Sequence, residues 1–445
     1  MDAFRIEGGQ RLSGRVSVSG SKNAALPLMA ASLLTNAPVV LRGVPHLRDI
    51  ANMQRVLDEM GAESARSECG SDLTLRVYDE SRIHARYEIV STMRASICVL
   101  GPLLARRGRA RVSMPGGCAI GERPIDLHLR GLEALGAKFH LEGGDIVGEA
   151  TRLRGNTIFL GGPFGSTVLG TANVMSAAVL ADGVTIIESA ACEPEILDLA
   201  TMLNAMGAKI QGAGTPRITI EGVEELRGVE HRVMPDRIEA GTYIIAGAIT
   251  NGNLIVDNCP YDCLLAVFDR LQQIGVHVAE LPNGHAGPAI DLARTPYQQH
   301  RCSVEVSSDR RLQPVSVTTQ PYPGYPTDLQ AQLLALLCLA DGNSVVTEKI
   351  YPERFLHAAE LSRMGAKLFR QGPTVIVTGV KKLVGAPVMA SDLRASASLV
   401  LAGLAAEGLT IVNRVYHLDR GYEQMEDKLS RLGAKIERFD PDKGT

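Results

Sequence analysis

One phrase recurs six times along the chain, beginning with LDEMGAE at residues 57–63 and LEALGAK at 132–138. The other copies are LNAMGAK at 203–209, LQQIGVH at 271–277, LSRMGAK at 361–367 and LSRLGAK at 429–435. Their glycines are 68 to 75 residues apart, except for one interval of 90 between Gly275 and Gly365. Each glycine follows an amphipathic run, so each copy predicts a helix that ends in a glycine cap and is followed by a short strand.

A second feature recurs in step with the first and consists of segments rich in Ala, Ser and Gly. These segments occupy residues 21–34, 93–105, 171–183, 238–252, 327–342 and 393–408. They are apolar nearly all round, so they predict buried helices whose small residues let neighbours approach closely. Each unit therefore has the order strand, buried helix, strand, amphipathic helix, strand, strand, and six such units make up the chain.

Six units are too many for one core, and three per lobe is the simplest division. The long interval indicates an insertion around residues 280–322 rather than a boundary. The last unit lacks a final strand pair, so we expect residues 1–20 to supply one. This predicts a lobe of residues 21–234, a second lobe of residues 1–20 plus 235–445, and an active site in a cleft between them that closes about a hinge. A closed ring of six units is the alternative.

Composition restricts the classes of function. The 445 residues are 45% hydrophobic, which is typical of a globular protein. Their net charge of −3 creates no large electrostatic field that would attract nucleic acid. No stretch is apolar and long enough for a membrane span, and the charged N-terminus does not resemble a signal peptide, so we expect a cytoplasmic protein. The eight cysteines form no CxxC pair and the ten histidines form no cluster, so no metal site is expected.

Unusual polar residues gather at the predicted helix starts. Lys22 with Asn23, Arg94, Asp328 and Arg394 open buried helices, whereas Arg123, Arg354 and Arg420 precede amphipathic ones. If equivalent helices run parallel within a lobe, these ends meet at one face, where helix dipoles and free N–H groups favour anions. The pattern predicts a ligand with several negative charges.

Two loops stand apart from the repeat. Residues 113–126, SMPGGCAIGERPID, place Cys118 among glycines and close to Arg123, which favours a functional thiol over an inert one. Residues 165–170, GSTVLG, could receive a diphosphate on backbone amides, but their glycines fit neither a P-loop nor a dinucleotide fingerprint.

Several segments together resemble one known family. They are SGSKNAALP at 19–27, PGGCAIGERPIDLHLRGLEALGAK at 115–138, YPTDLQAQ at 325–332, ERFLHAAELSRMGAK at 353–367, SDLRASASLVLAG at 391–403 and YHLDRGYEQMEDKLSRLGAKIER at 416–438. The likeness is to the UDP-N-acetylglucosamine enolpyruvyl transferases. It implies an α/β class, the two-lobed enolpyruvyl-transferase fold, which is an inside-out α/β barrel of six βαβαββ repeats with three per lobe.

The resemblance implies an activity without a cofactor. Phosphoenolpyruvate would donate its enolpyruvyl group to the 3-hydroxyl of UDP-N-acetylglucosamine and release phosphate, the first committed step of peptidoglycan synthesis. The two small-molecule substrates are the only partners it implies. In this family a loop cysteine similar to Cys118 donates a proton, adds covalently to phosphoenolpyruvate and is alkylated by the antibiotic fosfomycin.

The resemblance also implies roles for individual residues. Asp328 would take the proton of the sugar hydroxyl, and Cys118 would give one to the enol carbon. The residues that would hold phosphoenolpyruvate are Lys22, Asn23, Arg123, Arg354, Arg394 and Arg420, with Lys22 and Arg420 also assisting the chemistry. The residues that would contact the nucleotide sugar are Arg94, Arg123, Pro124, Ile125, Asp126, Leu127, Val168, Gly170, Asp328 and Ile350. The diphosphate loop departs from the family pattern because it has no basic residue.

Three other functions are compatible with the fold. The related shikimate-pathway transferase uses the same donor, but the PGGCAIGERPID segment resembles only the sugar-nucleotide branch. A non-catalytic protein that binds UDP-sugars should have lost Cys118 or the basic residues. A transferase for another nucleotide acceptor is the third alternative.

Overall fold

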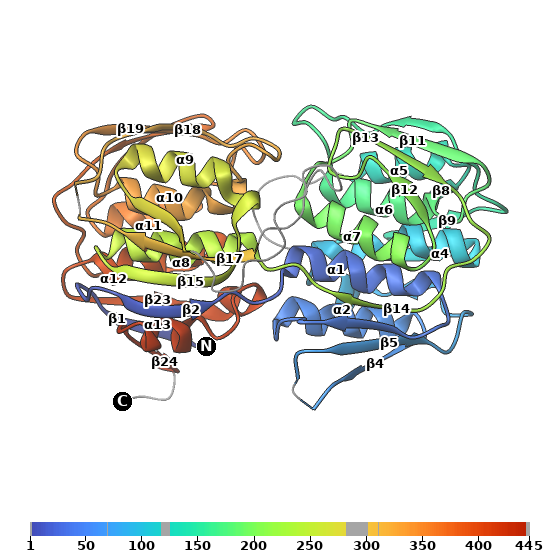
Figure 1. Cartoon of the computed structure of the whole chain (residues 1–445), viewed down its shortest axis with the longest axis horizontal. Coiled ribbons are helices and arrows are strands. Elements are labelled where there is room, and N and C mark those ends of the chain that lie inside the picture. Colours follow the sequence, from blue (N-terminus) through green and yellow to red (C-terminus); the bar gives the residue numbers. More distant parts are fainter. Residues whose placement is uncertain (1, 69, 117–124, 282–300, 310, 442–445) are drawn as a thin grey trace. The chain divides into compact units, whose positions relative to one another are not determined.

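The computed structural model describes residues 2–68, 70–116, 125–281, 301–309 and 311–441. Two compact units account for them: one contains the residues up to Ser19 and those from Pro235 onward, and the other runs from Gly20 to Met234. In each unit the strands lie on the outside and helices fill the interior (Figure 1).

The unit from Gly20 to Met234 has three four-stranded sheets. Their strand orders are β14 (Val229–Arg232), β3 (Val39–Arg42), β5 (Leu73–Val77), β4 (Ala62–Arg66); β6 (His84–Ala85), β7 (Arg109–Ser113), β9 (Asp145–Glu149), β8 (Lys138–Glu142); and β10 (Thr157–Phe159), β11 (Val184–Glu188), β13 (Arg217–Glu221), β12 (Lys209–Gln211). The helices are α1 (Lys22–Ala31), α2 (Arg48–Glu59), α3 (Tyr87–Val90), α4 (Leu100–Arg107), α5 (Asp126–Ala134), α6 (Val168–Ala178) and α7 (Pro194–Ala205), with 3-10 helices η1 (Ser32–Leu34) and η2 (Arg94–Val99).

The other unit repeats this design. Its sheets have the orders β22 (Pro387–Met389), β23 (Leu409–Asn413), β1 (Ala3–Glu7), β24 (Lys435–Phe439); β16 (His277–Leu281), β17 (Arg301–Ser307), β15 (Asn253–Pro260), β2 (Ser13–Ser17); and β18 (Ser316–Thr318), β19 (Asn343–Thr347), β21 (Thr374–Thr378), β20 (Lys367–Gln371). Its helices are α8 (Arg237–Ile249), α9 (Leu265–Ile274), α10 (Gln330–Leu337), α11 (Leu356–Arg363), α12 (Leu393–Ala405) and α13 (Met425–Arg431), with 3-10 helices η3 (Tyr261–Leu264), η4 (Thr327–Leu329) and η5 (Val415–Arg420).

The repeated phrase has the structure that its sequence predicts. All six glycines adopt positive φ angles, between 74° at Gly61 and 110° at Gly207, just after the amphipathic helices. A Cβ atom at Gly207 would meet no atom within 4 Å, so the left-handed backbone, and not lack of space, requires glycine there. In all six sheets one edge strand is parallel to its neighbour and the other pairings are antiparallel.

The first two strands do not pair with each other, contrary to the expected strand pair. β1 lies between β23 and β24, antiparallel to both, and so completes the sheet of the last repeat. β2 runs parallel to β15 and completes the sheet of the fourth repeat. The N-terminal residues therefore close two different sheets of the C-terminal unit.

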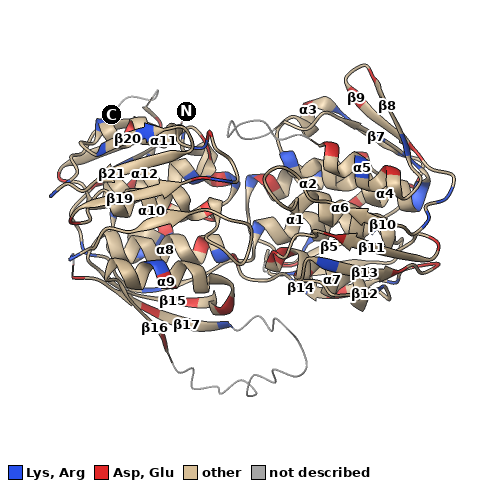
Figure 2. Cartoon of the chain, turned by 90° about the horizontal axis from the view of Figure 1, so that it is seen from above, with Lys and Arg blue, Asp and Glu red and all other residues tan. Residues whose placement is uncertain are grey.

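Small residues do permit close packing of the buried helices. The amide of Gly101 in α4 donates to Asn173 Oδ1 in α6 at 2.7 Å. A Cβ atom at Gly101 would lie 2.2 Å from the backbone oxygen of Asn173, so no larger residue fits there. The bodies of α6 and α10 carry no charged residue (Figure 2).

No helix among the described residues has both the length and the hydropathy to cross a membrane. Nor do these residues contain a group of three or more His, Cys, Asp or Glu side chains that could hold a metal ion.

Candidate active site

Three buried helices of the C-terminal unit, α8, α10 and α12, pack against one another. An aspartate lies at or just before the N-terminus of each of these helices. Asp236 caps α8 by accepting from the amides of Ile238 and Glu239, and Asp392 caps α12 by accepting from those of Arg394 and Ala395. Asp328 lies in η4, directly before α10. The caps of α8 and α12 already accept from two free N–H groups each, so at these two helix starts side chains are better placed than the backbone to bind an additional anion.

Asp328 is held by two arginines. Arg354 Nη1 donates to Asp328 Oδ1 at 2.8 Å, and Arg394 Nη2 and Nε donate to Asp328 Oδ2 at 3.2 and 3.3 Å. The side chains of Arg354 and Arg394 are 6% and 1% exposed, whereas that of Asp328 is 25% exposed. The structure thus brings together three residues that the sequence predicted for one site, and leaves the carboxylate accessible.

Both guanidinium groups remain charged. Burial alone would lower the pKa of Arg354, but Asp328 and Asp392 raise it above its ordinary value. Burial would also lower the pKa of Arg394, but Tyr422 and Asp328 raise this pKa above its ordinary value. Arg394 Nη1 is buried and makes no hydrogen bond of good geometry within the described residues, although Tyr422 also interacts with this guanidinium group. A buried cationic donor without such a bond is costly, so this N–H group suits an anionic ligand.

Two further predicted residues lie in the same unit. Ile350 is half-buried, and its amide donates to Glu348 Oε1 at 2.7 Å, which fixes the turn after β19. Arg420 is half-buried and is the last residue of η5, so it precedes the amphipathic helix α13 by a short loop, as the sequence predicts.

In the unit from Gly20 to Met234, Lys22 is the first residue of α1, next to Asn23. Its Nζ lies 3.3 Å from Asp49 Oδ2, and both side chains are buried. Arg94 is half-buried and opens η2, a 3-10 helix, rather than an α-helix. Two features act against α-helical bonding here: Asn173 accepts from the Gly101 amide and donates to the Ile97 carbonyl, and Pro102 has no N–H for the Cys98 carbonyl.

The predicted nucleotide-sugar residues of this unit lie at two helix starts. Ile125 is buried at the N-cap of α5, followed by exposed Asp126 and half-buried Leu127. Val168 is the first residue of α6, whose cap is Thr167. The amide of Gly170 donates to Thr167 Oγ1 at 3.2 Å, so a diphosphate contact to this amide would have to displace the cap. Cys118, Arg123 and Pro124 lie outside the described residues.

The thiols that the structure describes contrast with the role predicted for Cys118. Burial raises the pKa of Cys98, Cys302 and Cys338 to about 12, and it also raises those of Cys259 and Cys192. These thiols therefore stay protonated at neutral pH and are poor nucleophiles.

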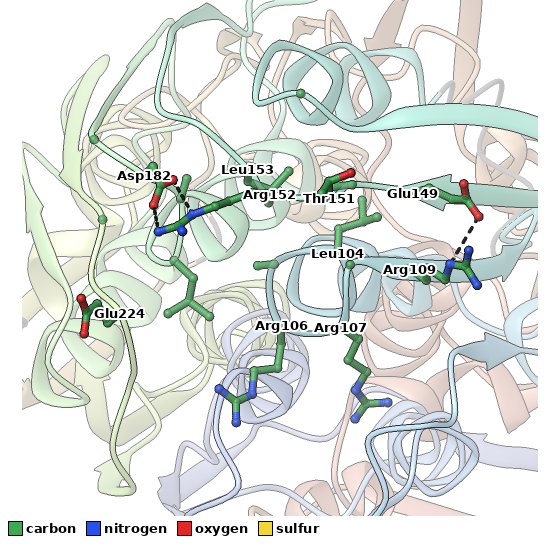
Figure 3. Close-up of a pocket in the computed structure, with 18 of the residues that line it drawn as sticks. Leu104, Arg106, Arg107, Arg109, Glu149, Thr151, Arg152, Leu153, Asp182 and Glu224 are labelled. Atoms are coloured by element: carbon green, nitrogen blue, oxygen red, sulfur yellow. Dashed lines mark hydrogen bonds and ion pairs between the residues drawn. The ribbon is translucent and has the colours of Figure 1, made fainter.

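A cavity of about 1090 Å³ in the unit from Gly20 to Met234 does not contain the predicted site (Figure 3). It lies at the C-terminal end of α4, where backbone carbonyls favour basic residues. Three of its lining arginines are already paired: Arg109 with Glu149 at 3.4 Å, Arg152 with Asp182, and Arg106 with Glu80 at 2.9 Å. The fourth, Arg107, donates through Nη1 to the backbone carbonyls of Met60 and Arg82, and its Nε and Nη2 have no hydrogen-bond partner among the described residues. Helix polarity and the three ion pairs disfavour an anionic substrate here, and none of the residues predicted for the site lines this cavity.

Sequence reasoning missed several carboxylates next to the predicted residues. Asp49 pairs with Lys22, Asp392 lies 4.0 Å from Arg354, and Glu348 anchors the turn of Ile350. Asp49 and Asp392 occupy the same positions in the repeat as the basic residues, at helix starts. The sequence therefore carried a signal for these two carboxylates, because an acidic residue at a helix start is as visible in the repeat as a basic one.

Comparisons with known proteins agree with the fold. Residues 6–429 match the family model of EPSP synthase (3-phosphoshikimate 1-carboxyvinyltransferase). The UDP-N-acetylglucosamine 1-carboxyvinyltransferases of Lawsonia intracellularis and Myxococcus xanthus are each 51% identical to this chain, and in both cases the alignment covers 98% of this chain and 99% of the relative. The chain belongs to this enolpyruvyl transferase family.

Solved structures confirm the predicted fold of this transferase. The enolpyruvyl transferase NikO from Streptomyces tendae is 27% identical, with a TM-score of 0.86 over 98% of this chain and 99% of the other. EPSP synthase from Acinetobacter baumannii is 18% identical, with a TM-score of 0.75 over 99% and 100%, a likeness of fold alone.

Proposed function

We propose that this enzyme transfers the enolpyruvyl group of phosphoenolpyruvate to the 3-hydroxyl of UDP-N-acetylglucosamine and releases phosphate. The observation that carries the proposal is the accessible Asp328 carboxylate held between two buried arginines. The full-length identity of 51% to UDP-N-acetylglucosamine 1-carboxyvinyltransferases supports the choice of acceptor. The expected cytoplasmic location and roles in peptidoglycan synthesis, cell shape and cell division belong to the same proposal.

Asp328 supplies the base in the addition step. Its carboxylate accepts the proton of the sugar hydroxyl as that oxygen bonds to C2 of phosphoenolpyruvate. Cys118 gives a proton to C3, which produces a tetrahedral ketal. Loss of a proton from C3 and breakage of the bond between C2 and the phosphate oxygen then yield the enolpyruvyl ether and phosphate.

The cationic residues hold the donor. Arg394 carries a buried N–H that makes no hydrogen bond of good geometry in the described part of the chain, and this group suits the carboxylate or phosphate of phosphoenolpyruvate. Lys22, Asn23, Arg123, Arg354 and Arg420 complete the proposed anion site. The proposed binding site for the nucleotide sugar consists of Arg94, residues 123–127, Val168, Asp328 and Ile350. We propose that the lobes of residues 21–234 and of 1–20 plus 235–445 both contribute, with the substrates between them.

Phosphate release from phosphoenolpyruvate tests the acceptor. UDP-N-acetylglucosamine should support turnover, whereas shikimate 3-phosphate and UMP, supplied at the same concentration, should not. The shikimate arm is needed because the matching family model carries the name of the shikimate enzyme. Turnover with shikimate 3-phosphate, or none with UDP-N-acetylglucosamine, would reject the proposal.

Cys118→Asp should leave an active enzyme that resists fosfomycin. Aspartic acid can still donate a proton, but it lacks the sulfur that attacks the epoxide. Alkylation of the wild-type enzyme should occur on Cys118 alone, since burial raises the pKa of several other thiols. Peptide mass spectrometry checks the site, with Cys192→Ser as the control. An adduct on another cysteine, or undiminished inactivation of Cys118→Asp, would contradict this.

A further inference from the structure

Glu348 is a fully buried carboxylate directly after β19, close to the Asp328 site. Its four hydrogen-bond donors are all neutral: two backbone amides and two threonine hydroxyls. Within the described part of the chain no lysine or arginine forms an ion pair with it. A carboxylate buried in this way depends on its hydrogen bonds, so its four partners are held firmly in return.

One oxygen of Glu348 organises the turn that follows it. Oε1 accepts from the amides of Ile350 at 2.7 Å and Tyr351 at 3.0 Å. It also accepts from the Thr319 hydroxyl at 2.7 Å, and Thr319 Oγ1 in turn accepts from the amide of Lys349 at 2.9 Å. These contacts fix the backbone of Ile350.

The other oxygen reaches the candidate base through one hydroxyl. Thr327 Oγ1 donates to Glu348 Oε2 at 2.9 Å. Because its proton is directed at Glu348, its lone pairs are free to accept, and Arg354 Nη1 donates to it at 3.1 Å. The same Nη1 donates to Asp328 Oδ1 at 2.8 Å. The direction of the Thr327 hydroxyl therefore sets where Arg354 lies relative to Asp328.

We propose that Glu348 is a positioning residue for the transfer reaction, acting on Asp328 through Thr327 and Arg354. The inference rests on the proposed function, because it assigns Asp328 the role of base. Glu348 touches no substrate in this account. It fixes the polarity of one hydrogen-bond chain, and that polarity keeps Arg354 shared between Thr327 and Asp328.

Glu348→Gln tests the polarity of the chain. The glutamine oxygen can still accept from both amides, but its NH₂ group faces Thr327 and donates to the hydroxyl. The Thr327 proton must then point away from residue 348, and the hydroxyl has one lone pair fewer for Arg354. We expect kcat to fall about 10- to 100-fold, since small misplacements in a site cost this much. The KM for UDP-N-acetylglucosamine should stay within about threefold, because the Ile350 side is kept.

Thr327→Val breaks the chain at its second member and should lower kcat in the same way. Thr327→Ser, which retains the hydroxyl, should restore most of the rate lost in Thr327→Val. The control is Glu353→Gln: Glu353 is an exposed carboxylate that pairs with Arg370 at 2.7 Å, and its loss should change neither constant. Thermal unfolding shows which variants remain folded, and Thr327→Val decides the matter if Glu348→Gln does not fold.

The outcomes separate the two proposals. A wild-type enzyme without turnover on UDP-N-acetylglucosamine overturns the proposed function. An active wild type whose folded Glu348→Gln and Thr327→Val variants keep normal kcat overturns the inference alone. So does a rise in KM without a fall in kcat, because that would confine Glu348 to shaping the turn of Ile350.

Discussion

Asp328→Asn should lower kcat by about two to four orders of magnitude, the contribution typical of a positioned general base. Asparagine has nearly the same shape and can still accept from one arginine, but it cannot take a proton from the sugar hydroxyl. Arg354 or Arg394 would then face an NH₂ group across a contact that is now 2.8 to 3.3 Å long. Steady-state phosphate release measures the effect.

A matched aspartate serves as the control for this substitution. Asp257 lies in the same unit, is 26% exposed compared with 25% for Asp328, and accepts from Arg15 at 2.8 Å. Asp257→Asn should keep kcat and lose at most a little stability, since exposed ion pairs contribute about 1 kcal/mol or less. If Asp328→Asn retained wild-type kcat, the assignment of the base would be wrong.

Arg394→Lys should be nearly as damaging as Arg394→Ala. Arg394 uses Nε and Nη2 for Asp328 and leaves a buried Nη1, whereas a single ammonium group cannot serve both directions. Loss of a desolvated charged contact costs about 2 to 5 kcal/mol, so kcat/KM for phosphoenolpyruvate should fall about 30- to 5,000-fold. Initial rates at varied phosphoenolpyruvate check this.

Arg438 offers the corresponding control, because it also binds several carboxylates. It contacts Asp419 and Glu426 at 2.6 Å each. Asp419 is the chain neighbour of Arg420, but no contact of Arg438 within the described residues is to a residue predicted for the site. Arg438→Lys should leave kcat/KM unchanged even where it lowers the melting temperature. Near-normal rates for Arg394→Lys would contradict the forked role of the guanidinium.

The repeat architecture could be predicted because its signals are local. A left-handed residue at each amphipathic helix end requires glycine, and this happens at all six copies. The small residues of the buried helices were equally readable, as the contact between Gly101 and Asn173 shows. These features depend on neighbours in sequence or on one helix face, so one sequence suffices.

The pairing of β1 and β2 was not predictable in the same way. β1 pairs with β23 and β24, and β2 pairs with β15. All these partners are more than 200 residues away in the sequence, and strand sequences alone do not specify partners at that distance. The expectation of a strand pair came from adjacency in sequence, which governs hairpins but not strands that close separate repeats.

The basic residues of the candidate site were predicted from the sequence, whereas most of its acidic residues were not. Arg354, Arg394 and Asp328 do meet, since their helix starts coincide in the repeat. Glu348 was missed because its importance depends on which hydroxyls and amides surround it, Thr319 and Thr327 among them. Such a network is a property of the folded backbone and has no signature in spacing.

The identity of the product tests the central claim most directly. The enzyme is incubated with phosphoenolpyruvate and an equimolar mixture of UDP-N-acetylglucosamine and shikimate 3-phosphate, and the products are analysed by mass spectrometry and NMR. The account predicts one product, UDP-N-acetylglucosamine with an enolpyruvyl ether on its 3-oxygen, formed in step with phosphate. An enolpyruvyl group found on the shikimate, or at another position of the sugar, would contradict it.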